Sequence, residues 1–469
     1  MVLSLGVASV AKSRRRQSPG KSPEIRFAPE PASIFLQPQN GGVNKSVSLQ
    51  ELVESRCQSL SSKFRPSWWL FNGHLQTLYS VLGDFSKTDQ MWYDRRLLRL
   101  LDGGTLGLDF APLDASTVRD DAPIIVVQHG LTGGSHEPYI RAVLAPACSP
   151  VEQGGLGYRA VVVNFRGCSG VPITSPKFYT AAQTDDLRQA LMYISKLYPH
   201  APLLGLGFSI GGNVLTRYLA EEGADSLLRS ACILGCPWDL KANNDYLLYN
   251  NTLGKRLYLR GMGENVITIM KQHRQVFLAD PRTAKAAHTV LHMKRPTLTD
   301  IDHLFTASVG TTAPFPFEDV HKYYIWASSH KVAEQIRVPC LTINAAGTAL
   351  FRLLFFHAPG LIVPVDDPVV QRVQTSVGQN GYIVSVLTAT GGHLGWFESK
   401  RKRWTTKPLL EWMQLFGTDV VRNPIELSLS IDEDGYIRDS RWPNLGCKEV
   451  AGGGRIDGNR PKSQLFQGL

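Results

Sequence analysis

Short apolar runs alternate with amphipathic stretches through the middle of this chain. The runs at 123–128 and 158–165 are almost wholly apolar, as expected of strands that are covered on both faces of a sheet. Between such runs, Leu187, Leu191 and Ile194 recur with the helical period. We therefore predict buried strands at 123–128, 158–165, 203–208 and 230–235, and helices at 138–148, 182–198 and 213–223.

Alternating strands and helices predict a mostly parallel, doubly wound α/β sheet with right-handed crossovers and helices on both faces. A hairpin with a glycine turn is expected before it at 92–113. After it come two more strands at 338–343 and 381–387 and a last helix at 405–415. The intervening residues 240–335 have a helical, amphipathic pattern, so we expect them to form an inserted helical cap.

Composition changes sharply at both ends of the chain. Residues 1–60 are rich in Pro, Ser, Gln and Arg without a sustained period, and we expect a disordered basic arm there. Residues 421–469 become Gly-rich and polar, which predicts a largely irregular tail. One catalytic domain over 64–420 remains. Part of the net charge of +10 lies in the arm, but no recognition motif accompanies it, so we expect no nucleic-acid partner.

The cysteines and apolar runs bear on the compartment. Seven cysteines cannot all pair, and none has CxxC spacing, so we interpret them as small buried hydrophobic residues of a reducing, cytoplasmic compartment. No uninterrupted apolar run reaches the roughly 18 residues of a membrane-spanning helix. Residues 1–26 lack the apolar core of a signal peptide, and their basic, acid-poor composition leaves mitochondrial targeting open.

A G-x-S-x-G pentapeptide at 207–211 follows the apolar run 203–208 and precedes a predicted helix. A serine on such a tight strand-to-helix turn has its hydroxyl exposed above the sheet, which favours Ser209 as a nucleophile over a capping serine. A dinucleotide-binding turn is the competing interpretation. The third glycine that it requires is replaced by Ile210, so nucleotide binding is not expected.

A serine nucleophile needs a base that a carboxylate orients. In this kind of fold the order along the chain is serine, acid, histidine. Of the eight histidines after Ser209, only His393 follows a late predicted strand within a Gly-bearing loop, so it is the candidate base. Asp366 and Asp367 follow the preceding strand, and we favour Asp367 as the acid, with Asp366 as the fallback.

The loop 128–134 follows the first buried strand, where donors for a developing oxyanion would lie. We predict the backbone N–H groups of Leu131 and Ile210 as these donors; a phosphate-binding nest is the alternative. His288 and His292 have the spacing of zinc ligands, but Thr rather than Glu follows the first of them, which favours ordinary helix-surface histidines. The chemistry calls for no metal or organic cofactor.

Six separated blocks resemble one branch of the α/β-hydrolases, which includes the fungal medium-chain fatty-acid ethyl ester synthase/esterases and bacterial and animal relatives. The resemblance spans about 64–420 and implies a Ser209, Asp367 and His393 triad. It also implies that the partners are a short- to medium-chain acyl ester and an alcohol or water. Some relatives cleave phospholipids or monoacylglycerols, so peripheral contact with membranes or lipid droplets is an open expectation. The blocks are FNGHLQTLY at 71–79, HGLTGGSHEPY at 129–139, NFRGCSG at 164–170, GFSIGGN at 207–213, DDP at 366–368 and GGHLGW at 391–396.

One departure from that family lies directly before the predicted acid. The pattern N-A-x-D-D-P is interrupted here by a 19-residue apolar segment at 347–365. We hypothesise that this segment is a translated intron retained in the gene model, which sequencing of the transcript tests. If the segment is genuine, it displaces Asp367, and a non-catalytic binding protein with the hydrolase fold, whose pocket holds a lipid or a signal, becomes the alternative.

Overall fold

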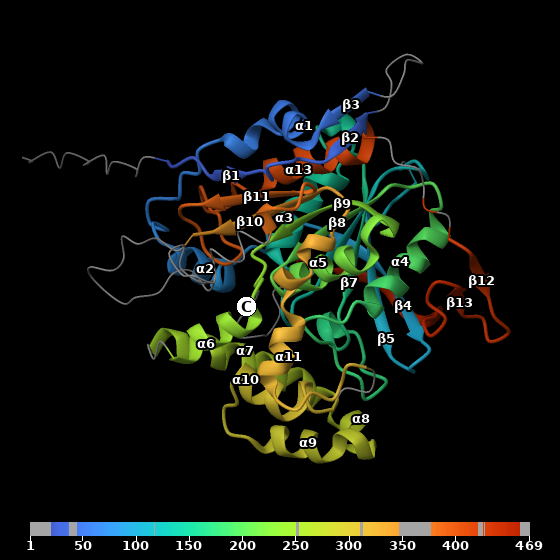
Figure 1. The fold of residues 1–469 in the computed structure, drawn as a ribbon. Coiled ribbons are helices and arrows are strands. Elements are labelled where there is room, and N and C mark those ends of the chain that lie inside the picture. The colour runs from blue at the N-terminus through green and yellow to red at the C-terminus, as the bar shows by residue number, and fades with distance from the viewer. Residues whose placement is uncertain are drawn as a thin grey trace, which may run out of the picture.

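The computed structural model describes residues 20–36, 45–116, 118–249, 253–309, 313–346, 377–420, 425 and 427–459. Within these ranges, twelve strands form one sheet in the order β1-β11-β10-β9-β8-β6-β7-β5-β4-β14-β13-β12, with helices on both faces (Figure 1). The predicted doubly wound α/β fold is confirmed. The predicted acids Asp366 and Asp367 and the segment 347–365 lie outside the described residues.

The centre of the sheet is parallel, as the apolar runs predict. Every residue of β6, β7 and β8 is buried, because helices cover both faces of these strands. The parallel strands are β7 (Arg159–Asn164), β6 (Ile124–Gln128), β8 (Leu203–Phe208), β9 (Leu228–Leu234), β10 (Cys340–Ala345) and β11 (Ile383–Thr388).

Alternate side chains of each strand enter two separate cores. Ile125 and Val127 of β6 pack in the core that α1, α3 and α13 cover, whereas Ile124 and Val126 pack in the core that α4 and α5 cover. A further helix, α2, packs on the loop that follows β11. The helices are α1 (Leu49–Arg56), α2 (Gly73–Leu82), α3 (Pro138–Cys148), α4 (Asp185–Leu197), α5 (Ile210–Glu222) and α13 (Thr406–Gln414).

The predicted hairpin is confirmed as β4 (Trp92–Leu100) and β5 (Thr105–Ala111), and β5 joins the parallel strands through β7. The expectation of a largely irregular tail over 421–469 is wrong in its described part. There, β14 (Cys447–Asp457) pairs antiparallel with β4, and β12 (Leu429–Ile431) and β13 (Ile437–Asp439) extend the sheet. Backbone pairing carries β14 across a glycine-rich register shift that its side-chain pattern does not reveal.

The expectation of a disordered arm over 1–60 is also wrong where the structure describes it, and the folded domain begins before residue 64. β1 (Glu24–Arg26) pairs antiparallel with β11, and β2 (Ser33–Leu36) pairs with β3 (Lys45–Ser48). Residues of α1 are buried in the same core as Trp412. Strands of three or four residues are too short to show a period, so the partner strand fixes them.

The segment predicted as a helical cap is helical in the structure and lies between β9 and β10 at one end of the sheet (Figure 1). Within the described part of the chain, no helix is long and apolar enough to cross a membrane. The elements of this helical segment are α6 (Leu240–Tyr249), α7 (Leu253–Gln272), α8 (Arg274–Ala279), α9 (Pro281–His292), α10 (Leu298–Ile301), a π-helical turn (Asp302–Thr306) and α11 (Val320–Ala327).

Candidate active site

Ser209 occupies a strained turn between β8 and α5. Its φ of 53° and ψ of −123° lie in a region that residues with a Cβ rarely adopt. The flanking glycines permit the close packing around this turn. A Cβ on Gly207 would lie 2.7 Å from the Cα of Gly212, and a Cβ on Gly211 would lie 2.3 Å from the carbonyl oxygen of His129. The G-x-S-x-G spacing is therefore a packing requirement of the turn.

The structure brings Ser209 and His393 together from positions 184 residues apart in the chain. The distance from Ser209 Oγ to His393 Nε2 is 2.8 Å, which is that of a hydrogen bond. His393 lies on the loop after β11, at the end of the sheet where β8 leads into α5. Only 8% of Ser209 is exposed. A hydroxyl and an imidazole in this geometry can exchange a proton.

The other ring nitrogen of His393 lacks an acceptor among the described residues. Nδ1 is buried there without a hydrogen-bond partner. If Nε2 accepts the proton of Ser209, a neutral imidazole carries its own proton on Nδ1, and that buried donor requires an acceptor. Asp366 and Asp367 lie outside the described residues, so the distance from either carboxylate to His393 is not defined. Burial alone lowers the pKa of His393 to about 4, and a carboxylate at Nδ1 would oppose this shift.

A second histidine, His129, is fully buried beneath the loop that follows β6. Its Nδ1 lies 2.7 Å from the carbonyl oxygen of Gly130, and its Nε2 accepts the backbone N–H of Phe165 at 3.1 Å. The tautomer that satisfies both contacts donates from Nδ1 and is neutral. His129 therefore shapes the backbone of this loop.

The Leu131 N–H lies between two N–H groups that are already engaged. Gly130 donates to the hydroxyl of Tyr139 at 3.0 Å, and Thr132 donates to the hydroxyl of Tyr179 at 3.2 Å. Within the described residues, the Leu131 N–H donates to no protein acceptor. A Cβ on Gly130 would lie 3.5 Å from the Cβ of Ser209, so this loop faces the serine.

Ile210 supplies the first N–H group of α5, which has no acceptor within the helix. The N–H groups of Leu131 and Ile210, the two residues predicted as oxyanion donors, are therefore available to an oxygen bound at Ser209.

Helix α2 fixes the His393 loop through its polar side. Thr77 Oγ1 accepts the backbone N–H of His393 at 2.8 Å, and Ser80 Oγ donates to the carbonyl oxygen of Leu394 at 3.3 Å. Gln76 accepts the N–H of Phe397 at 2.7 Å and donates back to the carbonyl of the same residue at 3.2 Å. In the sequence this helix lies within one of the blocks of resemblance, and none of these positioning residues was predicted. Polar residues at adjacent helical positions indicate a polar contact of this helix but do not identify its partner.

Asn213, one turn into α5, connects the Ser209 helix to the helical segment. Its Nδ2 donates to the carbonyls of Ala181 and Ala327, both at 2.8 Å, and its Oδ1 accepts the N–H of Ser329 at 3.3 Å. The side chain is fully buried, so all three partners depend on it. The end of α11 is thereby held against α5.

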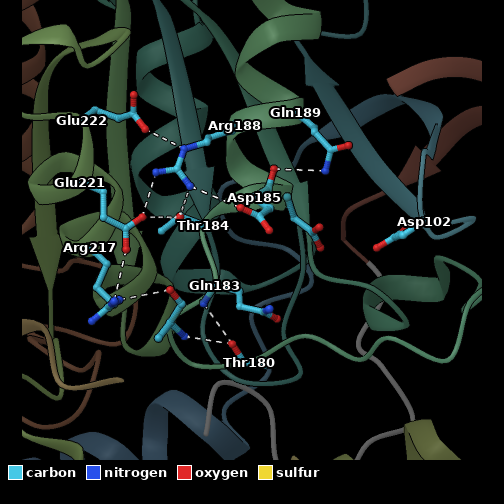
Figure 2. A network of polar contacts seen from close by, with 12 residues as sticks. Asp102, Thr180, Gln183, Thr184, Asp185, Arg188, Gln189, Arg217, Glu221 and Glu222 are labelled. Carbon is cyan, nitrogen blue, oxygen red and sulfur yellow. Dashed lines mark hydrogen bonds and ion pairs between the residues drawn. The ribbon is translucent and has the colours of Figure 1, made fainter. Parts of the chain in front are cut away.

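A charged network continues this connection along the same helix (Figure 2). Arg217 donates to the carbonyl of Trp326 at 2.7 Å and pairs with Glu221 at 3.2 Å. Arg188 of α4 pairs with Glu221 at 2.9 Å and with Glu222 at 2.6 Å (Figure 2). Helices α4, α5 and α11 therefore share one set of ion pairs and hydrogen bonds.

Backbone strain is concentrated around Ser209. Six non-glycine residues have a positive φ within the described ranges, and three of them belong to the loops just described: Thr132 at 54°, Ser209 at 53° and Leu394 at 55°. Such conformations persist where the surrounding contacts enforce them, and they are frequent at functional sites.

Other candidate ligands do not assemble in the described part of the chain. No group of three or more His, Cys, Asp or Glu residues there could hold a metal ion. His288 and His292 are exposed on α9, and His292 Nδ1 bonds the carbonyl of His288 at 2.8 Å. All seven cysteines are free and buried, and burial raises the pKa of Cys148 and Cys236 to about 12, so these two thiols are unreactive.

Comparison with known proteins identifies related chains over most of this length. The profile of the "alpha/beta hydrolase fold" family matches residues 123–255. An abhydrolase domain-containing protein of Dictyostelium discoideum is 30% identical over 76% of this chain and 82% of its own. A monoacylglycerol lipase of Saccharomyces cerevisiae is 27% identical over 87% of this chain and 91% of its own. Medium-chain fatty acid ethyl ester synthase/esterase 2 of the same yeast is 28% identical over 77% and 87%.

Proposed function

Because this chain belongs to the α/β-hydrolase family, we propose that it is a serine ester hydrolase acting on short- to medium-chain fatty acyl esters. The observation that carries the proposal is the 2.8 Å contact between Ser209 Oγ and His393 Nε2 on a strained strand-to-helix turn. A non-catalytic lipid-binding protein would not need to maintain that strain at a hydroxyl.

In the proposed acylation step, His393 Nε2 takes the proton of Ser209 as Oγ forms a bond to the ester carbonyl carbon. The carbonyl oxygen becomes negatively charged and is held by the N–H groups of Leu131 and Ile210. Asp367 accepts the Nδ1 hydrogen bond and stabilises the imidazolium. The bond from the carbonyl carbon to the leaving oxygen then breaks, and His393 gives its proton to the departing alcohol.

Deacylation repeats these steps with a different nucleophile. Water loses a proton to His393 as its oxygen bonds the acyl carbon, and His393 returns that proton to Ser209 Oγ as the acyl bond breaks. A second alcohol in place of water yields a new ester, so hydrolysis and alcohol acyltransfer share the acyl-serine. No metal or organic cofactor takes part in the proposed steps.

The acyl group is the part of the substrate that the helical segment favours. Leu131 is part of an apolar cluster with Val266, Met270 and Phe305 of that segment, and Ile210 packs against the same cluster. The two residues proposed to hold the oxyanion thus have apolar side chains that lead into the helical segment. We propose that an aliphatic chain attached to the reacting carbonyl extends from these two side chains towards the helical segment.

A monoacylglycerol lipase or a phospholipase is the second candidate. Similarity to the yeast monoacylglycerol lipase over 87% of this chain favours a monoacylglycerol over a phospholipid as the substrate of this second candidate. Both candidates use the same acyl-serine and differ in the leaving alcohol.

A panel of esters tests the proposal and separates the two candidates. The panel contains p-nitrophenyl esters from acetate to palmitate, a medium-chain monoacylglycerol and a phosphatidylcholine, each assayed with and without ethanol. We expect kcat/KM to peak at intermediate acyl lengths and ethyl esters to form when ethanol is present. A flat profile, or hydrolysis of palmitate alone, contradicts the medium-chain proposal. Preference for the monoacylglycerol by tenfold or more would favour the lipase. No turnover of any ester by folded protein would favour a binding protein.

A further inference from the structure

We propose that the outer face of α2, together with Lys400 and Arg401, docks onto an anionic phospholipid surface. Docking would bring the Ser209–His393 site to esters dissolved in that surface, and only this consequence rests on the proposed function. The binding itself is tested without catalysis.

Helix α2 carries apolar side chains on its exposed side, although several of its buried side chains are polar. Its buried residues include Gln76, Thr77 and Ser80, whose side chains hold the His393 loop. Its outer side carries Leu78 and Leu82, which are 45% and 60% exposed and lie one turn apart. Single exposed leucines need no explanation, but two exposed leucines one turn apart, on a helix whose buried side holds the His393 loop, mark a candidate docking face.

Two large aromatic residues just before the helix are exposed as well. Trp68 and Phe71 are 53% and 54% exposed. Asn72 caps α2 by accepting the N–H of Leu75 at 2.9 Å, and Phe71 directly precedes this cap residue. Tryptophan and phenylalanine beside leucines are the residues by which peripheral proteins enter the boundary between lipid headgroups and acyl chains.

Positive charge adjoins the apolar face. Tyr79 of α2 donates to the backbone carbonyl of Lys400 at 2.9 Å, so the basic loop contacts the helix. Lys402 pairs with Glu398 at 2.8 Å, whereas Lys400 and Arg401 are exposed and form no ion pair within the described residues. Basic residues near an anionic bilayer are attracted to its headgroups, and this attraction adds to the burial of apolar side chains.

The positive charge of Lys400 and Arg401 favours a lipid surface over a protein as the binding partner of this face. An apolar face alone would suit a second copy of the chain or another protein as well as it suits lipid. Exposed cations with no ion pair among the described residues, together with exposed Trp, Phe and Leu, match a surface with an anionic headgroup layer over an apolar interior. The inner side of the same helix bonds the backbone of His393, so a docked α2 keeps the catalytic loop next to the lipid.

Vesicle flotation of the full chain tests this proposal. The vesicles contain phosphatidylcholine alone or 70:30 phosphatidylcholine and phosphatidylglycerol. We expect wild type and Ser209→Ala to float equally with the anionic vesicles and several-fold less with the neutral ones. Leu78→Gln/Leu82→Gln and Lys400→Ala/Arg401→Ala should each lose most of the bound fraction. A matched control, Leu278→Gln/Ile431→Gln, removes residues that are 40% and 58% exposed elsewhere and should bind like wild type.

Activity on two substrates separates docking from damage. Hydrolysis of soluble p-nitrophenyl butyrate should be unchanged in Leu78→Gln/Leu82→Gln and in Lys400→Ala/Arg401→Ala. Hydrolysis of an ester embedded in anionic vesicles should fall at least fivefold in both variants. Equal flotation of wild type and Leu78→Gln/Leu82→Gln would overturn the proposal. So would a wild-type dimer in gel filtration that this variant converts to a monomer, since a second copy would then cover the face. If wild type hydrolyses no ester but floats with anionic vesicles as expected, and Leu78→Gln/Leu82→Gln does not, the proposed function fails and the docking surface stands.

Discussion

The hydroxyl oxygen of Thr77 lies 2.8 Å from the backbone nitrogen of His393, although 316 positions separate the two residues in the chain. The contact fixes the backbone of the loop that carries the imidazole, and it does so from a helix outside the crossover pattern of the sheet. A loop with adjacent glycines would otherwise sample many conformations. We therefore regard Thr77 as a residue that positions the catalytic base.

Replacing Thr77 with Val keeps the shape of the side chain and removes the acceptor. We expect kcat on p-nitrophenyl butyrate to fall about tenfold with little change in KM, because the base is less well oriented while substrate binding persists. The free energy of unfolding should fall by about 1 to 2 kcal/mol. Thr289→Val, on the exposed side of α9, is the control. A variant with wild-type kcat would show that Thr77 has only a structural role.

Asn213→Ala should destabilise the fold and loosen the helical segment. The change leaves three backbone groups without the side chain that pairs them, and we expect the free energy of unfolding to drop by about 2 to 4 kcal/mol. Urea denaturation measures this, with exposed Asn444→Ala as the control. Limited proteolysis should cut near 328 earlier in the variant. Equal stability of the two variants would contradict the role assigned to Asn213.

The pH dependence of kcat/KM reports on the acid that faces His393. Only neutral imidazole accepts the proton of Ser209, so kcat/KM should rise as pH increases through the pKa of His393. Burial holds that pKa at about 4, and a carboxylate at Nδ1 would raise it. We therefore expect Asp367→Asn to lower both the rate and the apparent pKa, whereas Asp366→Asn changes neither. A shift in Asp366→Asn alone would reassign the acid.

Asp302 should make stability depend on pH. Burial raises its pKa to about 6, and Tyr324 donates to its carboxyl at 2.8 Å. Because the folded state holds this proton more tightly than the unfolded state, the stability contributed below pH 4 is lost as pH rises through 6. Asp302→Asn keeps a neutral side chain, so its free energy of unfolding should fall less than that of wild type between pH 4 and 7, by on the order of 2 kcal/mol. The exposed Asp434→Asn should follow wild type; a parallel curve for Asp302→Asn would contradict the assigned pKa.

The centre of the sheet could be predicted because its sequence signal is strong. Runs such as 123–128 are buried on both faces, and no other common element needs that pattern at that length. The edges could not be predicted in the same way. Residues 24–26 form a strand because β11 offers them a pairing edge, and 447–457 form one across glycines because β4 does. Pairing of backbone groups leaves little trace in side-chain periodicity.

The candidate site divides along a similar line. Ser209 and His393 could be found because the neighbouring residues in the sequence indicate a strand-to-helix turn at the serine and a glycine loop after a late strand at the histidine. The supports of His393 could not be found, because Thr77 and Gln76 act through backbone groups more than 300 positions away. Only the folded chain brings such donors and acceptors together.

The account depends most on covalent chemistry at Ser209, and an active-site label tests this directly. Full-length protein is incubated with a fluorophosphonate probe, digested, and analysed by mass spectrometry. We predict one modified peptide, containing Ser209, in wild type and its loss in Ser209→Ala, with labelling slowed at least 100-fold in His393→Ala. Absence of label from folded wild-type protein, or equal labelling of Ser209→Ala, would contradict the assignment of Ser209 as the nucleophile.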